Sequence, residues 1–184
     1  DSFDIFLADL RTGEIKKQLT TTSGYDAECS FSPDGKTICF TTRREGKPDA
    51  IYLMNADELQ DDTVLVDDLT RFFGENQGDH VGERLSRAGD VDGDGHMDFL
   101  IGAMDIELAS GARGAAYLVL GKTNFDPTNL LADADAIIHS EYAGSNFCEE
   151  IISADTDGDG LQDILLSAPY VDIPSNNRGH VFLS

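Results

Sequence analysis

The sequence of 184 residues predicts an all-β chain of repeated antiparallel units. Three observations lead to this fold class. The apolar runs, such as FLIGA and AAYLVL, are short and contain many β-branched or aromatic side chains. Gly-rich and polar turns separate these runs, and two internal repeats run along the chain. The apolar content of 40% is sufficient for a packed core, and only residues 127–136 could hold a helical turn.

The first repeat lies in residues 1–61. DIFLADLRTG at 4–13 is echoed by AIYLMNADEL at 50–59, so that Ile5 corresponds to Ile51. Between them, Ser32-Pro33-Asp34-Gly35 has proline and glycine where a type I turn with a glycine bulge requires them. The runs on both sides of this turn are rich in Phe, Ile, Cys and Thr, so this segment predicts a hairpin.

The cysteines Cys29, Cys39 and Cys148 are too few for a disulfide scaffold. A three-residue loop at 33–35 would set Cys29 directly opposite Cys39 in the predicted hairpin. Because directly opposed strand positions strain a disulfide, free thiols are the simpler interpretation, and a bridge between these two stays open.

The second repeat occupies residues 62–184, and its repeat spacing is the separation along the chain from Asp90 to Asp155. DVDGDGHMD at 90–98 recurs as DTDGDGLQD at 155–163, and the apolar runs FLIGA and AAYLVL recur as ILLSA and HVFL. Upstream of the acidic loops the alignment shifts by one position, so that VG at 81–82 corresponds to FC at 147–148. Antiparallel repeats of this kind are typical of a β-propeller with blades of four-stranded antiparallel sheets.

These motifs resemble two propeller families. Residues 70–184 resemble the FG-GAP repeats of integrin α-subunit β-propellers: VG and FC stand at the FG position, the DxDGDGxxD loop follows, and GAM and SAP stand at the GAP position. Residues 1–58 are similar to a TolB-type propeller blade, through SPDGKTICFTTRREGKPDAIYLMNAD. The resemblance implies TolB-like blades over 1–61 and two calcium-binding FG-GAP-like blades over 62–184, as separate units or as one continuous propeller.

Both acidic loops place four aspartates within nine residues, where like charges repel. A hard divalent cation with oxygen ligands at about 2.3–2.6 Å resolves this repulsion, so we expect a structural Ca²⁺ in each loop. Glycine at the sixth loop position permits the sharp reversal that an encircling loop requires. The expected ligands of the first site are the carboxylates of Asp90, Asp92, Asp94 and Asp98 and the carbonyl of His96. Those of the second site are the carboxylates of Asp155, Asp157, Asp159 and Asp163 and the carbonyl of Leu161.

The spacing excludes an EF-hand, which needs a bidentate Glu at position 12 of its loop. This chain has Ile101 and Leu166 there, inside apolar runs. Mg²⁺ fits less well because it demands octahedral geometry and keeps several waters. The alternative is an acidic, solvated turn without metal, which two copies in register disfavour.

Thirteen basic and thirty-five acidic residues give a net charge of -22, which argues against nucleic acid and anionic membrane surfaces as partners. The acidity is concentrated in residues 62–184, where six basic and twenty-three acidic residues leave -17, against -5 from seven and twelve in residues 1–61. No apolar run reaches the length of about 18 residues that a membrane span needs, so membrane insertion is not expected.

Catalytic motifs are absent from the sequence: it has no GxSxG, HExxH or CxxC, and its four histidines are scattered. We therefore expect a non-enzymatic, calcium-stabilised module for protein or glycan contact and adhesion, in an extracellular, cell-surface or periplasmic location. Two alternatives are a gate or substrate platform that accompanies a hydrolytic enzyme, and an engineered hybrid of two propeller families with no natural function.

The number of blades raises a further question, because propellers close with about four to eight blades. Residues 1–58 supply little more than one blade, and residues 70–184 about two. The chain could be a fragment, could close by pairing with another copy, or could combine two families. We expect its exposed blade edges to pair with another copy as a homo-oligomer or to borrow partner strands.

Overall fold

The computed structural model describes residues 3–21, 23–32, 35–43, 47–56, 69–107, 111–140, 146–158, 160, 162–170, 172–173, 176–177 and 180–183. Its regular structure is nearly all strand, which confirms the predicted all-β class. A 3₁₀ turn, η3 (Leu131–Asp133), lies in the stretch where the sequence allows a helical turn. In the part of the chain covered by these ranges, no helix has the length and apolar character that a membrane crossing requires.

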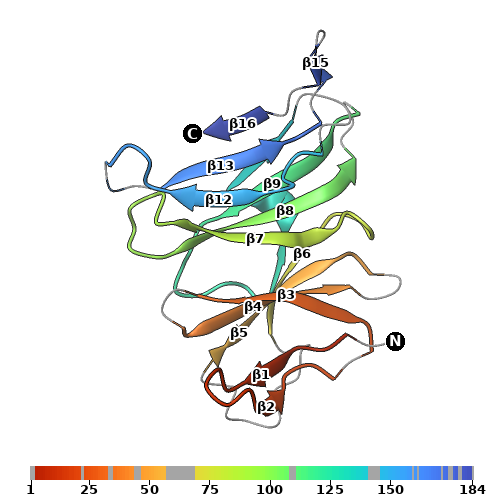
Figure 1. Cartoon of the computed structure of the whole chain (residues 1–184), viewed down its shortest axis with the longest axis vertical. Helices are drawn as coiled ribbons and strands as arrows, with labels where there is room; N and C mark the ends of the chain where they lie inside the picture. The colour runs from red at the N-terminus through yellow and green to blue at the C-terminus, as the bar shows by residue number, and fades with distance from the viewer. Residues whose placement is uncertain are drawn as a thin grey trace.

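The sheets follow one another in chain order along the long axis of the molecule (Figure 1). At one end lies a hairpin of β1 (Phe6–Ala8) and β2 (Ile15–Gln18). The first sheet has the order β10-β6-β5-β4-β3 and contains β3 (Tyr25–Phe31), β4 (Thr37–Arg43), β5 (Ala50–Asn55), β6 (Thr70–Phe73) and β10 (Thr128–Leu130). The second sheet has the order β11-β9-β8-β7 and contains β7 (Val81–Gly89), β8 (Asp98–Glu107), β9 (Arg113–Val119) and β11 (Ala136–His139).

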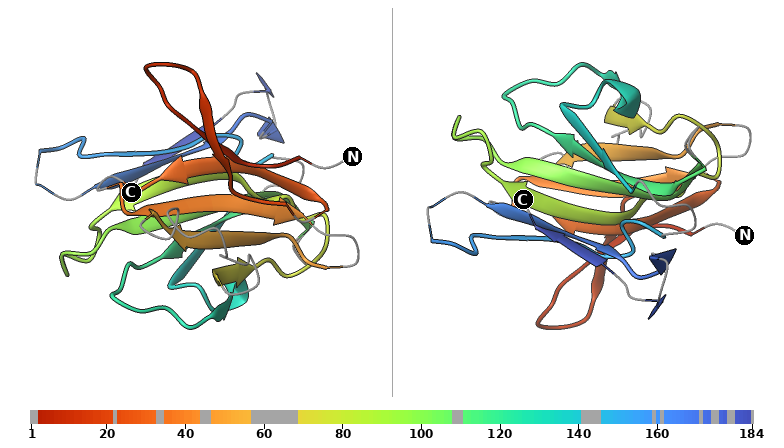
Figure 2. Two further views of the ribbon diagram at one scale, coloured as in Figure 1. Left: turned by 90° about the horizontal axis from the view of Figure 1, so that it is seen from below. Right: turned by 90° about the horizontal axis from the view of Figure 1, so that it is seen from above.

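The third sheet has the order β12-β13-β16 and closes the stack at the other end. It contains β12 (Ile151–Ala154), β13 (Asp163–Ala168) and β16 (His180–Leu183), and the short hairpin of β14 (Asp172–Ile173) and β15 (Asn176–Asn177) lies beside it. Figure 2 looks along the axis of the stack, from each end, so that the sheets overlap one behind another. The second sheet is four-stranded and antiparallel, as expected for a blade, whereas the first has five strands and the third has three among the described residues.

The cores lie between neighbouring sheets, and β8 shows how one strand serves two of them. Ile101 packs in a cluster with Ile51 of the first sheet, whereas the next residue toward the N-terminus, Leu100, packs in a cluster with Leu166 of the third sheet. Successive strand residues point to opposite faces, so both faces of β8 are buried. This two-sided burial explains why the run FLIGA is apolar throughout instead of alternating.

The strand pairing reproduces the second sequence repeat. Ile101 of β8 faces Tyr117 of β9, and Leu166 of β13 faces Phe182 of β16. Ile101 and Leu166 are separated by the repeat spacing defined by Asp90 and Asp155, and so are Tyr117 and Phe182. The repeat seen in the sequence is therefore a repeat of strand register as well.

A β-bulge accounts for the slip of one position upstream of the acidic loops. Leu85 faces Ile101 and Ile151 faces Leu166, so Ile151 lies one position beyond the repeat spacing from Leu85. The register of β7 then shifts between Arg87 and Gly89, so that Ala88 is an extra residue in this strand. After the bulge the repeat spacing is restored, because such an insertion moves every later residue by one position.

The predicted hairpin of β3 and β4 forms, but the predicted register at its end is wrong. Ser30, not Cys29, faces Cys39, because Ser32 N donates to the carbonyl of Thr37, which makes the loop one residue longer than predicted. The pairing returns to the predicted register beyond a bulge between Ala27 and Ser30, where Glu28 adopts a φ of +49°. Cys29 is exposed, Cys39 is half-buried, and both are free thiols, so no bridge joins them. Gly35 adopts the left-handed conformation that the turn signal predicts, with a φ of +71°.

Two strands of the first sheet, β6 and β10, come from residues 62–184. Phe72 of β6 faces Ile51 of β5 in an antiparallel pair and faces Asn129 of β10 in a parallel pair. The amide Nδ2 of Asn129 donates to the carbonyl oxygens of Arg71 at 3.2 Å and of Asp126 at 2.7 Å, which fixes β10 against β6. The connection between β9 and β11 thus reaches back and joins the preceding sheet, whereas purely antiparallel sheets were expected.

The first and second sheets approach closely at Gly82, the glycine of the VG pair. The hydroxyl of Thr41 on β4 donates to the Gly82 carbonyl at 2.9 Å in a buried hydrogen bond. A Cβ atom at residue 82 would lie 2.1 Å from Cδ1 of Ile51 and 2.2 Å from Oγ1 of Thr41. The two sheets can pack at this distance only because residue 82 has no side chain.

Candidate metal centre

The first acidic loop connects β7 to β8, which are neighbours in the second sheet. Asp98 opens β8 and is buried, and its Oδ2 and Oδ1 accept hydrogen bonds from the backbone N–H groups of Val91 and Gly121, both at 2.7 Å. At the other end of the loop, Oδ2 of Asp90 accepts a hydrogen bond from Gly95 N at 2.9 Å. These bonds hold the two ends of the loop together.

Three of the predicted ligands form a cluster. Asp90, Asp92 and Asp98 each offer a carboxylate oxygen, and these oxygens lie within 4.8 Å of one another. A single cation with ligand distances of about 2.3–2.6 Å can contact three oxygens at this spacing.

One carboxylate oxygen of Asp90 lacks a partner. Oδ1 of Asp90 is buried, and no group in the described ranges donates a hydrogen bond to it. A buried carboxylate oxygen without a partner is destabilising, and a cation bound by the three aspartates would supply the missing interaction. The residues present therefore fit Ca²⁺, which prefers oxygen ligands.

Asp94 is not part of this cluster. Its Oδ1 accepts a hydrogen bond from His96 N at 2.7 Å, and Asp94 N in turn donates to Oδ1 of Asp92 at 3.1 Å. Bonds of this kind from an aspartate to the backbone two residues on stabilise tight turns. The ring Nε2 of His96 lies 3.4 Å from Oγ1 of Thr123. The carboxylate of Asp94 and the carbonyl of His96 stay predictions as ligands.

The second acidic loop repeats two hydrogen bonds of the first and has a third, from Gly158 N to Oδ1 of Asp155 at 2.6 Å. Gly160 N donates to Oδ2 of Asp155 at 3.0 Å, and Thr156 N donates to Oδ2 of Asp163 at 2.9 Å. Both bonds have their counterparts in the first loop at the repeat spacing, so the two loops have the same closure. Among the other predicted ligands, Asp157 is exposed, and Asp159 and Leu161 lie outside the described residues.

The two loops differ in what holds the closing aspartate. The hydroxyl of Thr156 also donates to Oδ2 of Asp163, and the hydrogen bonds from Thr156 hold the pKa of Asp163 below its ordinary value. They favour the charged carboxylate, which is the form that a cation requires. The first loop has Val91 at this position, which offers only its backbone N–H.

Glycines at two positions of each loop adopt left-handed backbone conformations. The φ values are +76° and +90° for Gly93 and Gly95, and +81° and +94° for Gly158 and Gly160. Sequence reasoning assigned a role only to the sixth loop position, although the DGDG pattern signals both.

Sequence reasoning missed two residues that support the loops from outside. Gly121 binds Asp98 through its N–H, and a Cβ at residue 121 would lie 2.3 Å from the carbonyl oxygen of Met97. Gln162 packs on Gly89 at the entry to the first loop, where an added Cβ would lie 1.9 Å from its Cγ. Neither role has a signal in the local sequence, because both depend on contacts between distant segments.

A second group of charged residues links β4 to β7. Arg43 Nη2 lies 3.1 Å from Oε1 of Glu83, and Arg43 Nε lies 3.6 Å from Oδ2 of the buried Asp49. Burial raises the pKa of Asp49, and the positive charge of Arg43 lowers it in part. This group joins the first sheet to the second and lies apart from the aspartate cluster in sequence.

The comparisons with known proteins bear on the C-terminal part of the chain. Residues 150–183 match the FG-GAP repeat family, over the third sheet and the second acidic loop. The match supports propeller-type repeats here, of a kind found often in adhesion proteins and typical of extracellular or surface proteins. No comparison supports the resemblance of residues 1–58 to a TolB-type blade. A search of the curated proteins finds no match to this chain.

Proposed function

We propose that this chain is a calcium-stabilised β-propeller module outside the cytoplasm, which contacts a protein or glycan partner and catalyses no reaction. In this proposal residues 62–184 are two FG-GAP-like blades with one Ca²⁺ each, and residues 1–61 are TolB-like blades of the same propeller. The FG-GAP match at residues 150–183 supports the propeller and the location.

The observation that carries the proposal is the cluster of Asp90, Asp92 and Asp98. Its three oxygens lie within 4.8 Å of one another, and the buried Oδ1 of Asp90 has no donor among the described residues. Mutual repulsion and a missing partner both disfavour this arrangement without a cation, and both are relieved by one. The matching closure of the second loop supports a second site of the same kind.

The proposed role of the ion is structural. Each loop joins two adjacent strands of one sheet, β7 to β8 and β12 to β13. A cation held by aspartates from the beginning, middle and end of such a loop would fix the connection and with it the start of the buried central strand. Because the ion binds the folded chain, it adds to the free energy of unfolding by mass action.

Thermal and denaturant unfolding with chelator and with Ca²⁺ test this role. At a Ca²⁺ concentration about 100-fold above the dissociation constant, each site should add about 2.7 kcal/mol to the free energy of unfolding. Asp92→Ala and Asp157→Ala should each lose the Ca²⁺-dependent stabilisation that one site contributes. Asp126→Ala, which removes an exposed carboxylate outside the loops, should keep the full response. The proposal fails if Ca²⁺ does not change the stability of the unchanged chain, or if it stabilises the unchanged chain and all three variants equally.

The two ends of the stack support self-association. Phe6 and Ile15 on the β1–β2 hairpin and Ile152 on the third sheet are apolar and 49%, 64% and 52% exposed. In the proposal a second copy covers these end surfaces and completes the propeller. Light scattering should then show a mass that rises with concentration and falls in Ile152→Asp. A monomeric mass at all concentrations would contradict this part of the proposal.

A further inference from the structure

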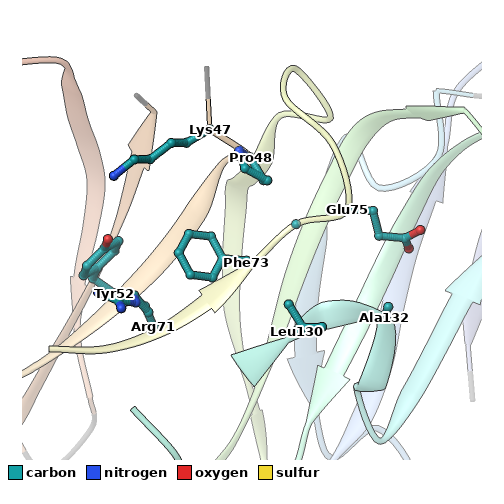
Figure 3. A pocket seen from close by; sticks show the side chains of 9 residues that line it. Lys47, Pro48, Tyr52, Arg71, Phe73, Glu75, Leu130 and Ala132 are labelled. Atoms are coloured by element: carbon teal, nitrogen blue, oxygen red, sulfur yellow. The ribbon is translucent and has the colours of Figure 1, made fainter. Parts of the chain in front are cut away.

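A cavity of about 700 Å³ lies where β10 joins the first sheet, with no residue of the acidic loops in its wall (Figure 3). Pro48, Tyr52, Phe73 and Leu130 give this wall a largely apolar surface. They lie before β5, on β5, on β6 and at the end of β10, in that order. The cavity therefore depends on the parallel pairing of β10 with β6.

Tyr52 brings an unpartnered polar group into this wall. The residue is only 7% exposed, and its ring stacks on Phe40 at a centroid distance of 5.7 Å. Figure 3 shows its hydroxyl on the side of the cavity where the ammonium of Lys47 lies. No residue in the described part of the chain forms a hydrogen bond with this hydroxyl. A tyrosine buried to this extent usually has a hydrogen-bond partner, so the hydroxyl points to a ligand.

The other polar side chains of the wall do not supply an acceptor for this hydroxyl. Lys47 and Arg71 carry only hydrogen-bond donors at their charged ends. The carboxylate of Glu75 accepts a hydrogen bond from the hydroxyl of Tyr117 at 3.2 Å, and Figure 3 shows it directed away from the Phe73 ring. The missing partner is therefore an acceptor that comes from outside the wall.

The apolar part of the wall is already ordered. Nε of Arg71 donates to Oγ1 of Thr128 on β10 at 3.2 Å, and Cζ of Arg71 lies 5.6 Å from the centre of the Phe73 ring. Arg71 thus belongs to the framework of the wall and is not a group left for a ligand. Leu130, on the other side of the Phe73 ring in Figure 3, is 54% exposed. Such a preformed surface can bind a flat apolar group at little conformational cost.

We infer that this cavity binds a small, uncharged aromatic compound whose carbonyl oxygen accepts a hydrogen bond from Tyr52 while its ring packs on Phe73. A mainly apolar wall with few polar groups is typical of small-molecule sites, and the volume lies in their usual range of about 300–1,000 Å³. The net charge of -22 disfavours an anionic ligand, so the acceptor is assigned as a neutral carbonyl. Such binding requires neither Ca²⁺ nor the proposed partner contact.

Titration of the full chain with three compounds of similar shape, followed by NMR, tests the ligand class. The probes are acetophenone, 1-cyclohexylethanone and benzoate. Acetophenone should bind about fivefold more tightly than the saturated ketone, because an aromatic ring makes a better pair with Phe73. Benzoate should bind more weakly than acetophenone, because the acidic chain repels its charge. Equal binding of the two ketones, tighter binding of benzoate, or no binding of acetophenone at millimolar concentration would overturn the inference.

Variants then assign the binding to Tyr52. Tyr52→Phe removes only the unpartnered hydroxyl, so the chain should fold as before and bind acetophenone about fivefold more weakly. Its affinity for ethylbenzene, which has no acceptor, should stay unchanged. Tyr170→Phe makes the same change at an exposed position outside the cavity wall and should bind acetophenone like the unchanged chain. If the two variants have the same effect, or if Tyr52→Phe weakens both compounds alike, the hydroxyl of Tyr52 does not bind the ligand and the inference is wrong.

Discussion

At the scale of single residues, two positions show how one backbone conformation tolerates different side chains. Gly82 and Cys148 are the second residues of the VG and FC pairs, and both have left-handed conformations, with φ of +82° and +67°. Gly82 lies directly against Thr41 and Ile51, whereas the thiol of Cys148 is fully buried in the core between the second and third sheets. Burial raises the pKa of this thiol, so its role is packing and not reactivity.

Gly82→Ala should therefore destabilise the chain for two reasons. The left-handed backbone costs about 1–3 kcal/mol for a residue with a Cβ, and overpacking against Ile51 and Thr41 adds about 1–3 kcal/mol. Gly78→Ala is the matched control, because its φ is +87° but no atom lies within 4 Å of the added Cβ. Denaturant unfolding should show a clearly larger loss for Gly82→Ala. Equal losses would mean that the close approach of the two sheets contributes nothing.

Asp49 should give the chain a measurable pH dependence. Burial raises its pKa above the ordinary value of 3.8, so the folded chain holds this proton more tightly than the unfolded chain. This contribution to stability is complete below the ordinary value and is lost as the pH rises through the folded pKa. Urea unfolding in saturating Ca²⁺ from about pH 4 to pH 7 should therefore show the unchanged chain losing stability relative to Asp49→Asn. If the unchanged chain instead gains stability relative to Asp49→Asn as the pH rises, the pKa of Asp49 is not raised in the folded chain.

At the scale of strands and loops, much of the structure could be predicted from the sequence. The runs FLIGA and ILLSA predict buried strands, and both form the centre of their sheets as β8 and β13. The left-handed conformation of Gly35 was also predicted correctly, because its signal lies in four consecutive residues. Three of the five groups predicted for the first metal site, Asp90, Asp92 and Asp98, lie together for the same reason, since their spacing is local.

The remainder could not be predicted because it depends on contacts between distant segments. The parallel pairing of β10 with β6 joins Thr128 to Arg71, and the short run TNL carries no strand signal. The cysteine register failed at the turn, where Ser32 bonds to Thr37 and the loop is one residue longer than predicted. The support of Asp98 by Gly121 is likewise visible only in the folded chain.

The contact between Gln162 and Gly89 should couple the two acidic loops. An added Cβ at residue 89 would lie 1.9 Å from Cγ of Gln162, and the φ of +85° adds backbone strain. Gly89→Ala should therefore cost more in the unchanged chain than in a Gln162→Ala background, where the clash with Cγ is removed and that with the Cβ of residue 162, at 2.7 Å, remains beside the strain. A double-mutant cycle should give a coupling of about 1 kcal/mol. Additive effects would show that the side chain of Gln162 moves aside without cost.

At the scale of the whole molecule, the segments with different repeat periods share one core. Ile51 and Phe72 of the first sheet are buried in the same cluster as Val81, Ile101 and Tyr117 of the second sheet. The cluster therefore spans the change of period and of charge balance between residues 1–61 and 62–184. Side chains packed in one core lose their contacts together, so the two sheets are expected to unfold as one unit.

Ile51→Ala tests this unit. The side chain is fully buried between the sheets, so its truncation should cost about 2–5 kcal/mol. Hydrogen exchange followed by mass spectrometry should then show faster exchange in β8 and β9 as well as in β4 and β5. Faster exchange confined to residues 1–73 would instead mean that the first sheet opens by itself.

The strand β10 gives this stack a mechanical property. Sheets that touch only through side chains come apart when those surfaces are pulled from each other. Here a piece of the second sheet's own connection is paired with β6, so a force that separates the first two sheets must also break backbone hydrogen bonds. The connection thus links the first and second sheets by backbone hydrogen bonds. Tension applied at the third sheet is therefore transmitted along the main chain into the first sheet.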